Sequence, residues 1–150
     1  MRFLDSNIVL YAYLKPKKGV ELPDDILERK AISKKIVERI EKGLEDVIIS
    51  TVHLAEILNI ISAKLGVEKS ILFLAKILTL KNVKIMEVSK DTYKRALEVS
   101  MKKNIEPNDA VAIVIMRDFK CDEIYTFDSD FLILEDINPV LLRRGMKEET

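Results

Sequence analysis

Residues 47–63, VIISTVHLAEILNIISA, join a strand signal directly to a helix signal. The first four residues are a β-branched run, which predicts a short buried strand. The remainder continues as an apolar helical segment, which we expect to end before Gly66. Glu56 is the only formally charged side chain in this stretch, although 33% of the chain is charged. Because an unpaired buried carboxylate costs on the order of several kcal/mol, Glu56 needs a partner or a metal.

The same alternation of strand and helix extends along the rest of the chain. Further strands are predicted at 2–4, 83–88, 123–127 and 139–142. Further helices are predicted at 8–14, 24–42, 68–80, 90–102 and 107–117. Strands that alternate with helices imply an α/β fold in which helices cover both faces of a parallel sheet. We expect one domain over residues 1–150, with a flexible polar tail at 147–150.

The composition excludes several classes of protein. The 25 basic and 25 acidic residues cancel, so net charge alone does not indicate a nucleic-acid partner. A single cysteine, Cys121, excludes an internal disulfide and fits a reducing compartment. With one His and one Cys, a structural zinc site cannot be assembled. No uncharged segment reaches about 18 residues, so we expect no membrane span and a cytoplasmic protein.

Three more acids lie within or beside apolar runs. Asp5 and Asp128 each follow a predicted strand, at the edge of an α/β sheet where ligands bind. Asp109 opens a helix that continues with seven apolar residues, AVAIVIM. Each of the three has an ordinary alternative, because an Asp after a strand can cap a helix or form a turn. An acid in a first helical turn is also favoured by the helix dipole.

Glu56 has no such alternative, apart from a costly ion pair with a distant Lys or Arg. Four carboxylates brought together would repel one another and could not all ionise in an empty site. A hard divalent cation would remove this repulsion. A set of oxygen ligands without thiolate or imidazole selects Mg²⁺ or Mn²⁺ over zinc. Such ions activate water and bind phosphodiesters, so the sequence predicts metal-dependent hydrolysis of phosphoryl bonds.

The order of four short motifs resembles that of PIN-domain nucleases. The resemblance is strongest to the small prokaryotic ribonucleases that act as toxins of toxin–antitoxin pairs, the VapC type. The motifs are FLDSN at 3–7, HLAEI at 53–57, NDA at 108–110 and TFDSDF at 126–131. The resemblance spans residues 2–142, and it implies a three-layer α/β/α sandwich with a central parallel sheet. It also implies endoribonuclease activity, in which a water bound to Mg²⁺ or Mn²⁺ cleaves RNA.

The resemblance assigns roles to individual residues. The acids of the metal site would be Asp5, Glu56, Asp109 and Asp128, with Asp5 and Asp109 as direct ligands. Glu56 would act through water or assist proton transfer. Asp130 would support a second metal, or would cap the short helix after it. The polar residues expected to orient these carboxylates through hydrogen bonds, or else to act as caps, are Ser6, Asn7 and Thr126.

The resemblance further implies an RNA substrate, an antitoxin partner and a homodimer, whose interface the apolar helices around 56–80 could supply. Residues 15–30 look longer than in compact members of the family. Lys15, Lys17 and Lys18 are therefore candidates for contact with RNA or a partner, although a solvated linker is the ordinary reading. An alternative function is a non-catalytic or RNA-processing module, in rRNA maturation or as a scaffold. A small-molecule phosphatase is disfavoured, because Asn7 stands where a second Asp would be needed.

Overall fold

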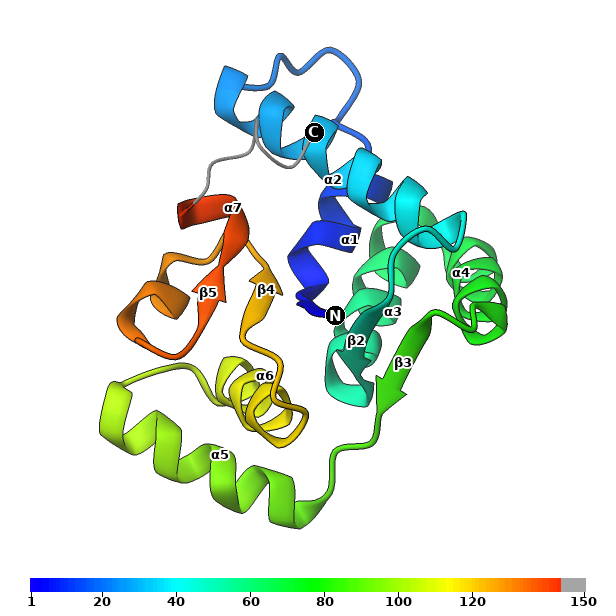
Figure 1. The fold of residues 1–150 in the computed structure, drawn as a ribbon. Coiled ribbons are helices and arrows are strands. Elements are labelled where there is room, and N and C mark those ends of the chain that lie inside the picture. Colours follow the sequence, from blue (N-terminus) through cyan, green and yellow to red (C-terminus); the bar gives the residue numbers. More distant parts are fainter. Residues whose placement is uncertain (144–150) are drawn as a thin grey trace.

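A parallel sheet of five short strands forms the centre of the molecule (Figure 1). The computed structural model describes residues 1–143. The strands are β1 (Arg2–Leu4), β2 (Val47–Ser50), β3 (Val83–Met86), β4 (Glu123–Tyr125) and β5 (Asn138–Pro139). Their order across the sheet is β3-β2-β1-β4-β5, and every neighbouring pair is parallel. Phe3 of the central strand is in register with Ile48 on one side and Ile124 on the other.

Helices cover both faces of this sheet, which confirms the expected three-layer α/β/α fold (Figure 1). One layer contains α1 (Ser6–Tyr13), α2 (Asp24–Glu41), α3 (Thr51–Leu65), α4 (Val67–Thr79) and the short α7 (Val140–Arg143). The other contains α5 (Lys90–Lys103), α6 (Pro107–Asp118) and the 3-10 helix η1 (Ser129–Ile133). Within residues 1–143, no helix combines the length and the apolar character needed to cross a bilayer.

Successive side chains of a strand point to opposite faces, and this alternation divides the core in two. Leu4 packs with the layer that contains α1 to α4, whereas Phe3 packs with α5 and α6. Helix α6 is buried all round, as its unbroken apolar run predicts. Its residues from Val111 to Met116 are at most 4% exposed. The position of Asp109 at the start of α6 is therefore set by a helix that is packed on every side.

Local sequence signals explain where the helices begin and end. Ser89 and Thr92 form a capping box at the start of α5, with both reciprocal N–H···O distances at 3.2 Å. Pro107 occupies the first turn of α6, where no N–H is needed. Gly66 adopts φ +98° between α3 and α4, a conformation that a residue with a Cβ rarely takes. Helix α3 can therefore turn back sharply into α4.

The predicted strand at 139–142 is wrong in part. Residues 138 and 139 form β5, and Val140 already begins helix α7. Proline has no N–H to donate to a ladder and is confined to sheet edges, which is where β5 lies. Strands β3 and β4 are also shorter than predicted, since they end at Met86 and Tyr125. The predicted tail at 147–150 lies outside the described residues.

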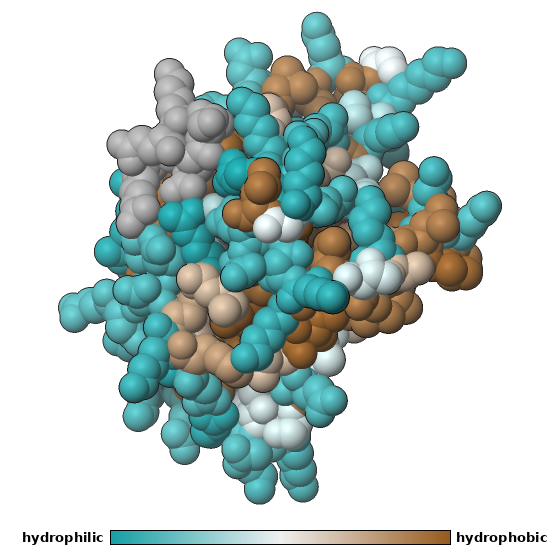
Figure 2. All heavy atoms as spheres, turned by 45° about the vertical axis from the view of Figure 1, so that its right-hand side comes forward, coloured by the Kyte–Doolittle hydropathy of each residue, from teal (hydrophilic) through white to brown (hydrophobic). Residues whose placement is uncertain are grey.

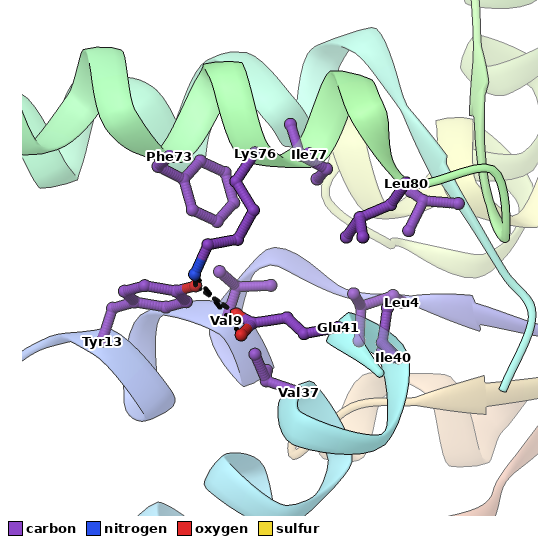
Figure 3. A pocket seen from close by; sticks show the side chains of 11 residues that line it. Leu4, Val9, Tyr13, Val37, Ile40, Glu41, Phe73, Lys76, Ile77 and Leu80 are labelled. Atoms are coloured by element: carbon purple, nitrogen blue, oxygen red, sulfur yellow. Dashed lines mark hydrogen bonds and ion pairs between the residues drawn. The ribbon is translucent and has the colours of Figure 1, made fainter. Parts of the chain in front are cut away.

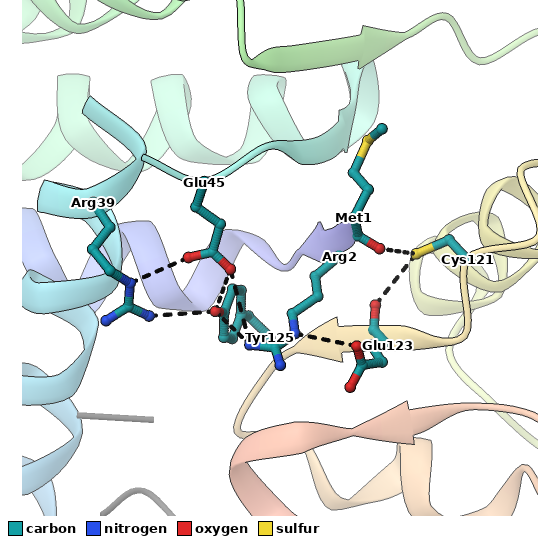
Figure 4. A network of polar contacts seen from close by, with 7 residues as sticks. All are labelled: Met1, Arg2, Arg39, Glu45, Cys121, Glu123 and Tyr125. Carbon is teal, nitrogen blue, oxygen red and sulfur yellow. Dashed lines mark hydrogen bonds and ion pairs between the residues drawn. The ribbon is translucent and has the colours of Figure 1, made fainter. Parts of the chain in front are cut away.

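The amino ends of the strands are tied together by a polar network (Figure 4). The buried Tyr125 hydroxyl accepts hydrogen bonds from Arg2 Nη1 at 2.6 Å and from Arg39 Nη2 at 3.3 Å, and it donates to Glu45. Arg39 Nε also lies 3.3 Å from Glu45 Oε2. Burial and the Glu45 carboxylate raise the pKa of Tyr125 to about 12. The phenol is therefore neutral, and the network links α2 to the sheet.

A second polar contact joins α1, α2 and α4 (Figure 3). Tyr13 donates its hydroxyl hydrogen to Glu41, and Lys76 Nζ lies 3.4 Å from Glu41 Oε2. The ring of Phe73 packs edge-on against Tyr13, with the ring centroids 5.3 Å apart. These contacts lie beside a cavity of about 30 Å³, which is far smaller than the pockets that bind organic ligands.

Candidate metal centre

The predicted acids lie at the carboxyl edge of the sheet, beside its central strand. Asp5 is the first residue after β1, and Asp128 follows the end of β4 by three positions. Glu56 lies on α3, the helix that directly follows β2, and Asp109 lies in the first turn of α6. After β1 the chain crosses to β2, which pairs with one side of β1, whereas β4 pairs with the other side. Ligands of open α/β sheets bind where the strand order reverses in this way.

Asp5 is held by the strand next to it. Its N–H donates to the Tyr125 carbonyl at 3.1 Å, which extends the β1–β4 pairing by one bond. Thr126 Oγ1 donates to Asp5 Oδ2 at 2.6 Å. Asp5 is only 6% exposed, and its side chain makes no capping hydrogen bond to α1. Helix capping therefore does not explain this buried carboxylate.

Glu56 is half-buried, and both of its carboxylate oxygens accept a hydrogen bond. Ser6 Oγ donates to Oε2 at 2.9 Å, and Asn108 Nδ2 donates to Oε1 at 3.1 Å. The Ser6 hydroxyl lies farther from Asp5 Oδ1, at 3.5 Å. Its single hydrogen is therefore directed to Glu56. The two donors come from α1 and α6, so they fix Glu56 between the helix that follows Asp5 and the helix that carries Asp109.

Asp109, Asp128 and Asp130 form the tightest group of acids in the described part of the chain. Each offers one carboxylate oxygen, and these oxygens all lie within 4.8 Å of one another. Asp128 Oδ1 accepts from the Asp130 N–H at 2.9 Å, so the capping alternative holds for Asp128. The Asp128 N–H in turn donates to Thr126 Oγ1 at 3.0 Å. Thr126 thus connects this group to Asp5.

Burial and mutual repulsion perturb two of the carboxyl groups. Burial raises the pKa of Asp5 to about 6, and the charges of Glu56 and Asp128 add to this, while the Thr126 hydrogen bond opposes it. Burial, and then the charges of Asp5 and Asp128, raise the pKa of Asp109 to about 8. Both groups therefore hold protons more tightly than free acids do. A divalent cation would favour their ionised forms.

The donor set fits a hard divalent cation. Oxygen atoms of Asp109, Asp128 and Asp130 are close enough to share one ion, and Asp5 lies near enough to repel Asp109. Oxygen ligands of this kind suit Mg²⁺ and Mn²⁺. His53, one turn before Glu56, is not part of the site. It is 1% exposed, its Nδ1 lies 2.5 Å from Ser50 Oγ, and burial lowers its pKa to about 4.

Four of the other residues singled out from the sequence lie on α1 and on the segment that follows it. Asn7 lines a cavity between α1 and α2, and its Oδ1 is buried with no hydrogen-bond partner among residues 1–143. Lys15 lines the rim of the same cavity, and Lys17 and Lys18 are exposed on the segment after α1.

Two residues at the start of α6 contribute to the site and were not assigned roles from the sequence. Asn108 donates to Glu56 and accepts from the Tyr93 hydroxyl at 3.3 Å. Glu106 caps α6, because its carboxylate accepts from the N–H groups of Asn108 and Asp109 at 3.0 and 3.2 Å. The only sequence signal for Asn108 was its place beside Asp109 in the NDA motif. Its partner Glu56 is 52 residues away in sequence.

Comparisons with known proteins agree with this geometry. The family model described as PIN domain matches residues 2–136. A comparison with curated proteins gave no match. Among solved structures, VapC20 from Mycobacterium tuberculosis, described as a toxin that cleaves the sarcin–ricin loop, superimposes with a TM-score of 0.65. It is 19% identical, over 88% of this chain and 93% of that one.

A chain from a toxin–antitoxin complex of Klebsiella pneumoniae has a TM-score of 0.61 and 14% identity, over 92% of this chain and 96% of that one. At these identities the two structures establish a shared fold. The family model covers nearly the whole described chain and includes Asp5, Glu56, Asp109 and Asp128. The chain belongs to the PIN-domain family.

Proposed function

We propose that this protein is a metal-dependent endoribonuclease that hydrolyses RNA phosphodiester bonds. The observation that carries the proposal is the convergence of acids from separate elements at one edge of the sheet. Asp109, Asp128 and Asp130 lie within sharing distance of one ion, and Asp5 and Asp109 have raised pKa values. The fold tolerates this repulsion, and a bound cation would compensate for it.

Asp5, Asp109, Asp128 and Asp130 would hold the cation or cations. A bound Mg²⁺ or Mn²⁺ supplies positive charge, which lowers the pKa of water and stabilises the charge that develops on a phosphodiester. Thr126 keeps the Asp5 carboxylate in place through its 2.6 Å hydrogen bond. It also orients the backbone at Asp128. Second partners of this kind fix the direction of a ligand and affect metal affinity.

Glu56 would act as a proton acceptor for the attacking water. Its two hydrogen bonds, from Ser6 and Asn108, hold the carboxylate in one orientation. The group is half-buried, so it can contact a substrate from the side of α3. Ser6 and Asn108 are positioning residues, because they act through Glu56.

The toxin of a toxin–antitoxin pair is the biological role we propose, in the cytoplasm, with an antitoxin as protein partner. The support is the family, the size of the chain and the likeness of its fold to the two toxin structures. RNA is proposed as the substrate, and Lys15, Lys17 and Lys18 are proposed as contacts to its phosphates. These lysines are exposed on the segment that follows α1, the helix that begins beside Asp5.

The activity is tested by incubating the purified protein with a mixed-sequence RNA and MnCl₂. We expect discrete cleavage products with Mg²⁺ or Mn²⁺, none with excess EDTA, and recovery when the cation is restored. The reason is that the ionised acids cannot stabilise negative charge on the phosphodiester without the cation. Cleavage that persists in EDTA would contradict a metal-dependent mechanism.

The exposed side of α4 is the interface that we propose for a homodimer. Val67, Ile71, Leu74 and Leu78 recur at a spacing of four, three and four residues, which is the pattern of a helix–helix seam. Val67, Ile71 and Leu78 are each more than 60% exposed. Figure 2, with the α4 side turned forward, shows hydrophobic side chains gathered there. A two-fold antiparallel pairing would bury the same seam on both copies.

The dimer is tested by the double substitution Ile71→Lys and Leu78→Lys, with the molar mass measured by light scattering after gel filtration. We expect a dimer for the unmodified protein and a monomer for the double variant, because four charges would enter a dry seam. Leu97→Lys is the control, since Leu97 is a comparably exposed leucine on α5, at 56%. A monomer before substitution would refute the dimer and leave the seam to another partner.

A further inference from the structure

A cavity of about 350 Å³ lies beside the acidic site, between α1, the segment after it and α2. Its walls are mainly apolar and include Leu10, Leu14, Leu22 and Ile26. Pockets of about 300 Å³ or more accept small organic ligands. The 30 Å³ cavity of Figure 3 has no such capacity. The larger cavity therefore has the size and lining of a binding site.

Two lining residues connect the cavity to the segments that carry Asp5 and Asp128. Asn7, which lines it, is two residues after Asp5 on the first turn of α1. Tyr11 lines it as well, and its ring packs edge-on against Phe127, with the centroids 5.3 Å apart. Phe127 directly precedes Asp128 in the chain. A ligand in the cavity would thus lie next to the segments that carry Asp5 and Asp128.

The polar groups of the cavity are an amide and a group of ammonium ions. Asn7 lines the cavity, and its buried Oδ1 has no hydrogen-bond partner among the described residues. Lys30 Nζ lies on the cavity wall and donates to the Tyr11 carbonyl at 2.9 Å and to the Leu14 carbonyl. Burial, together with the charges of Lys34 and Lys15, lowers the pKa of Lys30. Positive charge is therefore concentrated at this rim.

We propose that this cavity binds one nucleobase of the RNA substrate, next to the phosphodiester that is cleaved. The apolar walls would cover the faces of the base, and the side-chain amide of Asn7, which lines the cavity, would hydrogen-bond to its edge. Lys15 and Lys34 would contact the neighbouring phosphates. This inference rests on the proposed ribonuclease function, and it adds that cleavage depends on the base as well as on the backbone.

The first test measures binding without catalysis. In the presence of EDTA, the protein is titrated with AMP, CMP, GMP and UMP, and with ribose 5-phosphate as the ligand that lacks a base, by NMR or calorimetry. At least one nucleotide is expected to bind more than 10-fold more tightly than ribose 5-phosphate. Equal affinities, or binding of none of the nucleotides, would overturn the inference. Because no metal is present, this result does not depend on whether the protein cleaves RNA.

The second test fills the cavity. Ile26→Trp adds bulk on the lining, whereas Leu27→Trp adds the same bulk at the adjacent, 49% exposed position as the matched control. Ile26→Trp is expected to lose nucleotide binding and to raise KM for RNA at least 10-fold, while the Mn²⁺-induced rise in Tm stays. Leu27→Trp should match the unmodified protein. Unchanged binding and KM in Ile26→Trp would refute the proposal.

Asn7→Ala gives a second variant in case Ile26→Trp does not fold. It removes the amide without adding volume. We therefore expect a several-fold loss of affinity for the preferred nucleotide and weaker discrimination among the four bases. Retained discrimination would contradict the role of Asn7.

If the protein cleaves no RNA at all while nucleotides still bind, the proposed function fails and the base site remains. If Ile26→Trp disturbs only the binding of a protein partner, the cavity is a peptide site and the inference fails.

Discussion

Asp5→Asn is expected to lower the rate of RNA cleavage by about 10³-fold, which corresponds to a loss of several kcal/mol of transition-state stabilisation. Asp5 is 6% exposed at the end of the central strand and lies near enough to Asp109 and Asp128 to interact with their charges. Asparagine keeps the shape and can still accept the hydrogen bond from Thr126. It removes the negative charge that would hold a cation.

The same substitution should not weaken the fold. In the absence of metal, Asp5 is a buried acid with a pKa raised to about 6, so its neutral replacement relieves repulsion from Glu56 and Asp128. We therefore expect the metal-free variant to be at least as stable as the unmodified protein near pH 8. Opposite effects on activity and stability would separate a metal-site role from a structural one. An inactive variant that is also strongly destabilised would leave Asp5 with a structural role.

Asp46→Asn is the matched control, because Asp46 is an exposed acid directly before β2, at the opposite edge of the sheet. It should cleave RNA at the normal rate. Expression in a bacterial host gives a second readout, in which the unmodified protein arrests growth and Asp5→Asn does not. Full activity of Asp5→Asn would refute the proposed site.

The second large effect concerns the pH dependence of stability. A carboxyl group with a raised pKa in the folded state binds more protons there than in the unfolded chain, so the free energy of unfolding falls as pH rises. For Asp5 this fall begins near the unfolded value of 3.8 and ends above about 6. It amounts to about 2 kcal/mol between about pH 4 and pH 8. Asp109 extends the fall in the free energy of unfolding toward pH 8. Because the group is only half-buried, solvent screening reduces its contribution.

Two other acids contribute a stability that rises with pH, but they do so below about pH 4. Arg95 lowers the pKa of Asp118, and Arg117 lowers that of Asp136. Their contribution to stability is complete above the unfolded-chain Asp pKa of 3.8 and is lost only as pH falls below it. His53 opposes Asp5 within this range, because burial lowers its pKa to about 4 and the neutral imidazole of the folded state adds stability as pH rises toward 6.5. In EDTA, the protein is therefore expected to lose stability mainly between about pH 6.5 and pH 8, measured by urea unfolding at each pH.

A divalent cation should reverse this trend. It binds the ionised acids and adds stability according to its concentration, about 2.7 kcal/mol at 100 times its Kd. The effect of Mn²⁺ on Tm should thus be small near pH 5 and large near pH 8. Asp109→Asn should flatten the profile in EDTA and reduce the response to Mn²⁺. A profile that is unaffected by Mn²⁺ at every pH would favour a non-catalytic module over a nuclease.

Local sequence signals placed most of the fold. The β-branched run at 47–50 is β2, and the segment after it is α3, which ends before Gly66 as expected. Ser89 and Pro107 mark the starts of α5 and α6. The segment around Val140 and Leu141 was less predictable, because a short apolar run fits a strand and a buried helix equally well. Only their packing in the core around α1 to α4 decides for α7.

The candidate site was also predictable from the sequence only in part. The isolation of Glu56 in an apolar helix indicates a special role, because a lone buried carboxylate is costly in any fold. Which residues compensate for the buried charge depends on contacts between distant segments. Asn108 reaches Glu56 across 52 positions, and Thr126 reaches Asp5 across 121. Sequence spacing carries no information about such pairs.

By itself, the sequence determined the alternation of strands and helices, the buried α6 and the four acids that need compensation. These depend on local periodicity and on the cost of buried charge. The tertiary structure alone decided that Asp130 joins Asp109 and Asp128, and that Ser6 and Asn7 face different surroundings. Consecutive residues on an α-helix point about 100° apart, so Ser6 contacts Glu56 while Asn7 lines the cavity. What each direction meets is set by the elements packed against α1, which local sequence does not encode.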